Sequence, residues 1–276
     1  GFFDLNLAFP STYIRIAEIF YGYNKNKTRY EPIMSTMFER ILQTGKFGAF
    51  LDIGAFVGLY TVHAQRIDDR IKCLAVEGNV SFYKCLEENT RNLPNVICQH
   101  VILSDEDHGT VVPESLYLQK LVNTELNQSG APTMSLDRLC AERSFSPQIV
   151  KIDTDGSEGL IIAGAKEVFK NSVQCLLLEL TPEKRLVDRS KIYNSKSIFT
   201  TLAGLGFEVY YICGHRESLS AAYDKFTQTG SLVYFRLTHE NFAQIMSDHV
   251  TDVLIVATRN FDFAEVFGPS VSIWDA

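Results

Sequence analysis

The sequence predicts an α/β fold: a doubly wound, mostly parallel sheet with helices on both faces, preceded by an N-terminal helical extension. Three observations support this prediction. From residue 49 onward, short apolar runs alternate with helical segments, as in successive βαβ units. Several runs are almost entirely apolar, which is typical of strands buried on both faces of a parallel sheet. The first run ends at a glycine, as a sharp turn from strand to helix favours.

The apolar runs define the expected strands, and apolar residues at helical spacing define the helices between them. This alternation favours right-handed crossovers. Strands are expected at residues 50–53, 72–77, 96–103, 149–153, 173–180, 207–213, 232–237 and 253–257. Helices are expected at residues 13–21, 32–44, 59–66, 81–93, 136–140 and 160–170.

The chain divides into three parts by this pattern. Residues 1–48 form the N-terminal extension, residues 49–260 form the main domain, and residues 261–276 form an aromatic C-terminal tail that packs as a helix or an arm. Two long connections interrupt the main domain. The first, 104–132, is polar and is expected to contain a small β excursion at 111–118. The second, 214–230, is expected to be a loop that takes part in ligand binding.

Composition excludes several classes of protein. The 276 residues are 46% hydrophobic and 21% charged, as in globular rather than disordered chains. The net charge of −7 argues against a nucleic-acid binder, whose affinity depends on neutralising phosphates. No apolar run approaches the roughly 20 residues of a membrane span. The six cysteines include no C-x-x-C pair, so we expect buried free thiols and a cytoplasmic protein.

The first candidate ligand-binding loop is Asp52-Ile53-Gly54-Ala55-Phe56-Val57-Gly58. It joins a strand to a helix, whose N-terminus offers free N–H groups. Its D-x-G-x-x-x-G spacing differs from the G-x-G-x-x-G pattern of dinucleotide-binding loops. An acid at the strand tip repels a pyrophosphate and attracts an ammonium group. S-adenosylmethionine, which has an amino-acid moiety, a sulfonium and a ribose but no phosphate, suits such a loop. A plain turn with a capping acid is the alternative.

Two further sites follow the second and third strands. Glu77 ends the second strand and is followed by Gly78 and Asn79. A carboxylate at that position can accept hydrogen bonds from both hydroxyls of an adenosine ribose, or it can be an ordinary surface glutamate. Ser104 and Asp105 follow the third strand and either contact the adenine amino group or form a turn.

An acidic cluster follows the fourth strand, at the sheet edge where open α/β sheets bind ligands. Asp153, Asp155 and Glu158 lie within six residues. Clustered acids suit a general base, a cation site or the positioning of a hydroxyl group. Asp155 and Glu158 also have the spacing of a helix-capping pair. Asp153 precedes the turn, so it is the preferred functional acid.

Together these motifs resemble the FkbM family of S-adenosylmethionine-dependent methyltransferases. The I-K-I-D-x-[ED]-G-x-E run at 150–158 distinguishes this family from other methyltransferases. Phe56 stands where the family usually has Asn, and Gly78 where it usually has Pro. The other matching segments are 50–55 with Gly58, 75–77 with Asn79, Phe82, Leu86 and Asn89, 135–139, and Gly164.

The resemblance implies that residues 49–260 form a class I, Rossmann-like methyltransferase domain that binds S-adenosyl-L-methionine across its switch point. The implied reaction is O-methylation of a hydroxyl on a sugar or natural-product acceptor. Asp153 is expected to orient or deprotonate that hydroxyl, with Asp155 and Glu158 as further catalytic candidates. The cofactor-binding residues implied are Asp52, Gly54, Ala55, Phe56 and Gly58 at the methionine end, Glu77 at the ribose with Gly78 and Asn79 beside it, Ser104, Asp105 and Asp153.

Other functions stay open at this stage. One is a module that binds S-adenosylmethionine without catalysis, and another is a nucleotide-dependent oxidoreductase, which the glycine spacing disfavours. His63 is expected to be packed in a helix, and His215 is the histidine best placed for substrate contact. No metal site is predicted, because no regular ligand spacing supports one. Nothing in the sequence indicates an oligomeric state.

Overall fold

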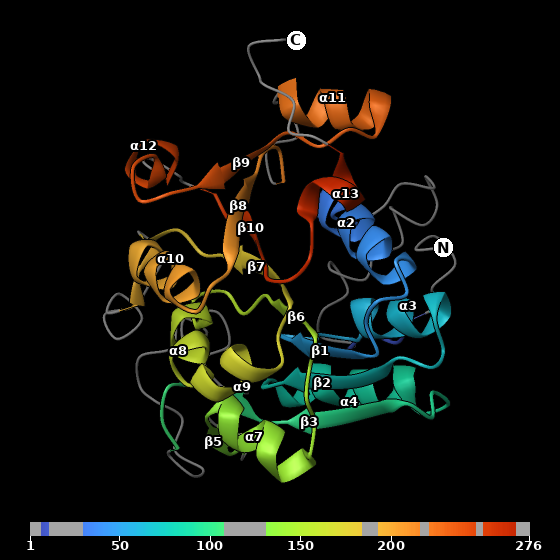
Figure 1. Cartoon of the computed structure of the whole chain (residues 1–276). Helices are drawn as coiled ribbons and strands as arrows, with labels where there is room; N and C mark the ends of the chain where they lie inside the picture. Colours follow the sequence, from blue (N-terminus) through green and yellow to red (C-terminus); the bar gives the residue numbers. More distant parts are fainter. Residues whose placement is uncertain are drawn as a thin grey trace.

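The computed structural model describes residues 7–10, 30–107, 131–183, 193–215, 221–246 and 251–268. The predicted helix at 13–21 and the predicted β excursion at 111–118 lie outside these residues. Figure 1 shows a central sheet with helices on both sides. Its strands are β1 (Ala49–Ile53), β2 (Lys72–Glu77), β3 (Val96–His100), β6 (Ile149–Ile152), β7 (Cys175–Leu180), β8 (Glu208–Ile212), β9 (Tyr234–Leu237) and β10 (Val253–Thr258).

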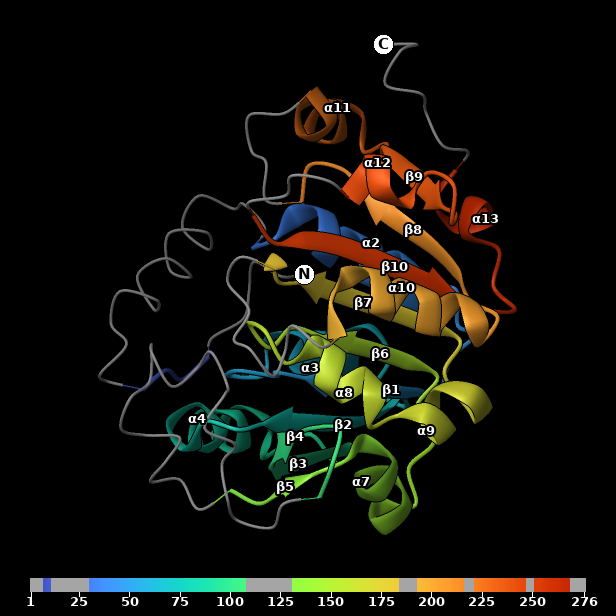
Figure 2. The same ribbon diagram turned by 90° about the vertical axis from the view of Figure 1, so that its left-hand side faces the viewer.

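The strand order of this eight-stranded sheet is β3-β2-β1-β6-β7-β10-β8-β9. The five strands from β3 to β7 run parallel to one another. Strand β10 is antiparallel to both its neighbours, and β9 is antiparallel to β8. Figure 2 shows the arrow of β10 pointing opposite to that of β7. The predicted doubly wound, mostly parallel sheet is therefore confirmed.

The chain order reverses between β1 and β6. From β1 the chain moves outward through β2 and β3, and it then returns to add β6 and β7 on the other side of β1. Such a switch point leaves a crevice at the carboxyl ends of the two central strands, where open α/β sheets bind their ligands. The predicted ligand-binding loops after β1, β2 and β6 follow strands at this edge.

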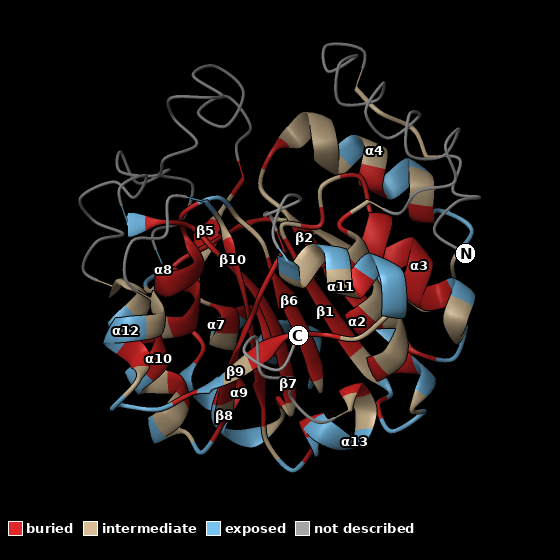
Figure 3. Cartoon of the chain, turned by 90° about the horizontal axis from the view of Figure 1, so that it is seen from above, coloured by how far each residue is buried: buried red, intermediate tan, exposed pale blue. Residues whose placement is uncertain are grey.

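Side chains from alternate positions of each strand enter two separate cores. Leu51 and Ile53 pack into one core, whereas Phe50, which precedes Leu51, packs into the other. The first core is covered by α7 (Leu136–Arg143), α8 (Glu158–Ala163), α9 (Lys166–Asn171), α10 (Ser195–Gly204) and α12 (Phe242–Met246). The second is covered by α2 (Pro32–Gln43), α3 (Leu59–Ile67), α11 (Ala221–Thr229) and α13 (Phe263–Phe267). Figure 3 shows buried strands beneath helices with exposed outer faces. Burial on both faces explains the continuous apolar runs.

The segments that flank the main domain pack on the same sheet. Met34, Met37 and Phe38 of α2 are fully buried, and Phe263 and Phe267 of α13 join them in one core. Helix α4 (Val80–Thr90) packs through Leu86 against Ala75 of β2. The six cysteines are free, as predicted; four are buried, and Cys85 and Cys98 are half-buried. Among the described residues, no helix has the length and apolar character that crossing a membrane requires.

Three predicted elements differ from the structure. The helix expected at 160–170 is two helices, α8 and α9. They separate around Gly164, where an added Cβ would lie 2.2 Å from the carbonyl oxygen of Ser104. The strand expected at 96–103 is β3 followed by β4 (Ile102–Leu103), which pairs with β5 (Thr133–Met134) in a separate sheet. The prediction of a loop at 214–230 is wrong for its second half, which forms helix α11.

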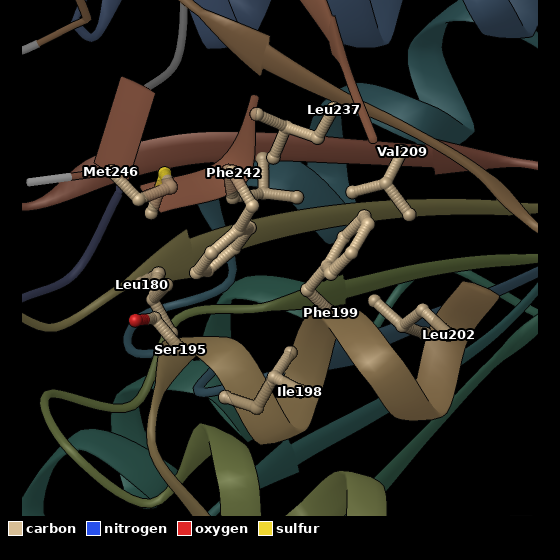
Figure 4. Close-up of a pocket in the computed structure, with 10 residues that line it drawn as sticks. Leu180, Ser195, Ile198, Phe199, Leu202, Val209, Leu237, Phe242 and Met246 are labelled. Atoms are coloured by element: carbon tan, nitrogen blue, oxygen red, sulfur yellow. The ribbon is translucent and has the colours of Figure 1, made fainter. Parts of the chain in front are cut away.

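A small apolar cavity lies between α10, α12 and the sheet (Figure 4). Its volume is about 10 Å³. That is about the space one water molecule requires, and apolar cavities of this kind stay dry. The cavity is a packing gap of the core and not a ligand site.

Candidate active site

The loop between β1 and α3 is held in place by close contacts of its backbone. Gly54 has φ 71°, and a Cβ added to it would lie 1.8 Å from the carbonyl oxygen of Asp153. The N–H groups of Gly54 and Ala55 both donate to the carbonyl oxygen of Val76, at 3.0 and 2.9 Å. Gly58 has φ 91°, and its added Cβ would lie 2.8 Å from Leu86 Cδ1. Gly54 therefore lets the tips of β1 and β6 approach closely, and Gly58 lets the start of α3 pack against α4.

Phe56 occupies the left-handed region, with φ 54°. Asn and Gly tolerate this conformation better than Phe does. Its ring packs against Phe82, with centroids 4.2 Å apart, and against Phe9 at 6.0 Å. The strained backbone directs the Phe56 N–H toward the end of β2, so the aromatic contacts help hold a conformation that the side chain itself disfavours.

Glu77 receives that N–H and a second one from the next turn. Its Oε2 accepts from the N–H of Phe56 and its Oε1 from the N–H of Asn79, both at 2.8 Å. The Asn79 side chain caps α4 by accepting from the N–H groups of Ser81 and Phe82. Burial raises the pKa of Glu77 to about 7, although the N–H groups of Asn79 and Phe56 favour the charged form. The backbone N–H of Gly78 also favours the charged form of Glu77.

A buried lysine links the acids of β1 and β6. Lys151 Nζ lies 3.0 Å from Asp153 Oδ2, 4.0 Å from Asp52 Oδ1 and 4.9 Å from the centre of the Tyr60 ring. Asp52 Oδ2 also accepts from the Thr61 hydroxyl at 2.7 Å. Burial raises the pKa of Asp52, and Lys151 opposes that rise. Burial alone would lower the pKa of Lys151, but nearby acids, Asp153 first among them, raise it, so the ammonium stays charged.

Asp52 is therefore placed beneath the loop, whereas Asp153 is half-buried at the sheet edge. Sequence reasoning missed Lys151. The signal was available, because a single charge within the otherwise apolar run Ile149-Val150-Lys151-Ile152 requires a buried partner.

Asp155 and Glu158, the other two acids of the cluster, differ in burial. Asp155 is exposed and has φ 53°. Glu158 is buried, and its Oε1 accepts from the N–H of Gly156 at 2.8 Å and from the Thr181 hydroxyl at 3.1 Å. Burial raises the pKa of Glu158 to about 7. Glu158 thus holds the turn before α8 and ties it to the end of β7.

Ser104 and Asp105 lie against α8 and α10. Ser104 is buried beside Gly164, and Asp105 accepts a 3.2 Å hydrogen bond from the Tyr193 hydroxyl. Asp105 also lines a cleft of about 340 Å³ between α8 and α10 that does not include Glu77. From β3 it is His100 that contacts the loop after β2, with Nε2 3.1 Å from the carbonyl oxygen of Gly78. Sequence reasoning missed His100, since a strand-end histidine carries no motif.

The structure thus brings together the Gly54–Gly58 loop, the Glu77–Asn79 turn and Asp153 at one edge of the sheet. The two histidines considered from the sequence are both buried. His63 is packed in α3 as predicted, with Nε2 3.1 Å from Glu39 Oε1. His215 lies 3.1 Å from Glu179 Oε2, and its contact with substrate stays a prediction.

No family model and no curated protein matches the chain. Similar solved structures include precorrin-6y C5,15-methyltransferase from Geobacter metallireducens GS-15, with 14% identity and a TM-score of 0.41 over 84% of this chain and 90% of that one. Methyltransferase FkbM from Methylobacillus flagellatus KT has 10% identity and a TM-score of 0.45 over 76% of this chain and 43% of that one.

A third similar structure is the plantazolicin methyltransferase BpumL in complex with a pentazolic desmethylPZN analog and SAH. It has 8% identity and a TM-score of 0.44, and the alignment covers 91% of this chain and 93% of that one. At these identities the neighbours assign no family, substrate or cofactor to this chain, and the resemblance to the FkbM family stays a prediction.

Proposed function

We propose that the chain is an S-adenosyl-L-methionine-dependent methyltransferase, and that it O-methylates a hydroxyl of a sugar or natural-product acceptor. The observation that carries this proposal is the carboxylate of Glu77. Two backbone N–H groups, from the loop after β1 and from the turn after β2, fix both of its oxygens at the switch point of the sheet. An oriented carboxylate at this position suits the paired hydroxyls of an adenosine ribose.

The described residues fit an adenosyl sulfonium donor in a second respect. The loop after β1 lacks the dinucleotide glycine spacing, and the acids Asp52 and Asp153 lie at the tips of the flanking strands. The Lys151 ammonium offsets one of these two negative charges, and the charge that remains disfavours a pyrophosphate and favours a cationic ligand. In this proposal Glu77 holds the ribose, Gly78 and Asn79 lie beside it, and the loop from Gly54 to Gly58 borders the methionine end. When bound, the donor supplies an electrophilic methyl group.

Asp153 is the residue we propose to receive the acceptor hydroxyl. The Lys151 ammonium, 3.0 Å away, stabilises an ionised carboxylate and fixes its direction. A carboxylate held in this way accepts a hydrogen bond from the hydroxyl and aligns the oxygen for in-line attack. As the new C–O bond forms and the S–CH₃ bond of the donor breaks, the hydroxyl proton passes to Asp153. Glu158 is a positioning residue, because it orders the turn that follows Asp153, and Asp155 lies on the exposed side of that turn.

The finer assignments belong to the same proposal. They are membership of the FkbM family, a hydroxyl rather than a nitrogen or carbon as the acceptor, and a reducing compartment such as the cytoplasm, which the six free thiols favour. The FkbM-type run from Val150 to Glu158 supports the first two.

The test of the proposal has two stages. Thermal unfolding with S-adenosylhomocysteine and, separately, with NAD identifies the ligand, because only a ligand that binds the native state raises the midpoint. We expect S-adenosylhomocysteine to raise it and NAD to leave it unchanged. A shift with NAD alone contradicts the proposal and favours an oxidoreductase.

The second stage measures transfer of a labelled methyl group from S-adenosylmethionine to a panel of hydroxylated sugars and polyketides. Transfer to a hydroxyl, shown by an alkali-stable ether, supports O-methylation. Calorimetric binding of S-adenosylhomocysteine without transfer to any acceptor in a wide panel favours the alternative of a catalytically silent binding module.

A further inference from the structure

Three buried side chains that no motif connects meet beside the candidate active site. Glu31 precedes α2, Glu179 lies near the end of β7, and His215 follows β8. One ligand atom of each lies within 4.8 Å of those of the other two. The residues are only 5%, 5% and 7% exposed. Their separation in sequence, from 31 to 215, explains why a search for regular ligand spacing did not detect them.

The contacts around the three side chains orient them toward one another. His215 Nε2 lies 3.1 Å from Glu179 Oε2, and the Tyr60 hydroxyl donates to Glu31 Oε2 at 2.8 Å. Burial raises the pKa of Glu179, and the negative charges of Asp153 and Glu31 raise it further. The two glutamates thus repel each other, and a cation between them would relieve that repulsion.

The imidazole of His215 provides the second, independent indication of a ligand. Its side chain is 1% exposed, and its Nδ1 has no hydrogen-bond partner among the described residues. If Nε2 carries the proton and donates to Glu179, the lone pair of Nδ1 is unsatisfied. If Nδ1 carries the proton, the lone pair of Nε2 faces a carboxylate oxygen. No protonation state satisfies both nitrogens with described groups, whereas buried polar atoms rarely stay unsatisfied.

We propose that Glu31, Glu179 and His215 bind one divalent transition-metal ion, with one imidazole nitrogen and one oxygen from each carboxylate as ligands. Mixed nitrogen and oxygen donors suit Mn²⁺, Fe²⁺ and Zn²⁺. Bonds of about 2.1 Å place neighbouring ligand atoms about 3 Å apart, so small side-chain rotations close the site. The ion joins the segment before α2, the sheet and the turn after β8. This inference does not depend on the proposed function.

The test uses the full, untagged chain after dialysis against EDTA, titrated with MnCl₂ and followed by the EPR signal of free Mn²⁺. Manganese is chosen because the six free thiols bind it poorly. We expect one ion per chain, a thermal midpoint higher by about 5 °C or more at 100-fold excess over Kd, and an electron–nuclear coupling to one imidazole nitrogen. Binding of less than 0.2 ion per chain, or a bound ion without that coupling, overturns the proposal.

Glu179→Gln and Glu39→Gln form a matched pair of variants. Glu39 lies 3.1 Å from the buried His63, which is the same separation as between Glu179 and His215. Among the described residues, however, no third ligand completes a metal-binding group around Glu39 and His63. We expect Glu179→Gln to weaken Mn²⁺ binding at least about 10-fold and Glu39→Gln to leave it unchanged. Equal affinities in the two variants contradict the proposal. If Glu179→Gln does not fold, His215→Gln replaces it in the comparison. The electron–nuclear coupling measured on the wild-type chain tests the proposal without any variant.

Discussion

The most informative perturbation is Glu77→Gln, because Glu77 is the residue on which the proposed cofactor site depends. Glutamine keeps one carbonyl oxygen and replaces the other oxygen by an NH₂ group. That group must face the N–H of either Phe56 or Asn79, each of which now donates to Glu77 at 2.8 Å. We expect the affinity for S-adenosylhomocysteine to fall strongly while the fold is kept.

The magnitude follows from the hydrogen bonds that change. A hydrogen bond to a charged acceptor contributes about 1.5–3 kcal/mol and one to a neutral acceptor about 0.5–1.5 kcal/mol. The variant loses one bond from the ribose and weakens the other, at a cost of about 2–3 kcal/mol, or roughly 30- to 150-fold in Kd. The glutamine NH₂ group, which then faces a backbone N–H, also lowers the free energy of unfolding of the ligand-free chain, by about 1 kcal/mol.

The pH dependence of binding provides a second signature. With a pKa of about 7, Glu77 is mostly protonated at pH 6 and mostly ionised at pH 8. Since the ionised carboxylate accepts hydrogen bonds from both hydroxyls, Kd for S-adenosylhomocysteine should be about 10-fold higher at pH 6 than at pH 8. Glu77→Gln should remove this dependence.

Stability responds to pH in the opposite direction. The pKa of Glu77 in the folded chain, about 7, is above the ordinary value of 4.5. The folded chain therefore keeps this proton where the unfolded chain has lost it, and the stability that Glu77 contributes below about pH 4.5 is lost as the pH rises through about 7.

Isothermal titration calorimetry at both pH values measures the affinities, and chemical unfolding measures the stability. Glu88→Gln on α4 is the control, since its carboxylate is exposed and pairs with Arg91. An affinity for S-adenosylhomocysteine that is the same in Glu77→Gln as in Glu88→Gln would refute the assignment of Glu77 to the ribose.

Three further predictions concern single residues. Asp153→Asn should lower the rate of methyl transfer about 10²- to 10⁴-fold while Kd for S-adenosylhomocysteine changes only a few-fold; unchanged turnover excludes the proposed role. Gly54→Ala should lower the free energy of unfolding by more than about 3 kcal/mol in urea unfolding, because its Cβ would lie 1.8 Å from a carbonyl oxygen at φ 71°; a stable variant contradicts the described turn. Ser144→Gly should stabilise the chain by about 0.5 kcal/mol, since exposed Ser144 ends α7 at φ 49°; a loss of stability argues against that conformation.

The parallel core of the fold was predictable because its strands are buried on both faces. Apolar runs such as Leu176-Leu177-Leu178 leave no other arrangement for a segment of strand length, and β2 has the predicted bounds of 72–77. Helix α11 was missed because Phe226 is its only buried residue, so its sequence has the polarity of a loop. The close approach of Gly164 to the carbonyl of Ser104 was missed because the two residues are distant in sequence.

The candidate site was predictable where its residues follow strand ends in sequence, as Glu77 and Asp153 do. Its supporting contacts were not. The charge within an apolar run indicated a buried partner for Lys151, but it did not indicate that Asp52 and Asp153 flank its ammonium group. The cluster of Glu31, Glu179 and His215 depends on three elements that meet in space. Spacing along the chain contains no record of such long-range contacts, so only the packed structure shows them.

The central claim is that the carboxyl edge of β1, β2 and β6 binds an adenosyl sulfonium donor. A crystal structure of the chain grown with saturating S-adenosylhomocysteine tests it most directly. We expect density for the ribose with both hydroxyls within hydrogen-bond distance of the Glu77 carboxylate. Density for the ligand in the cleft beside Asp105, or no density near Glu77 in a crystal whose site is open to solvent, would contradict it.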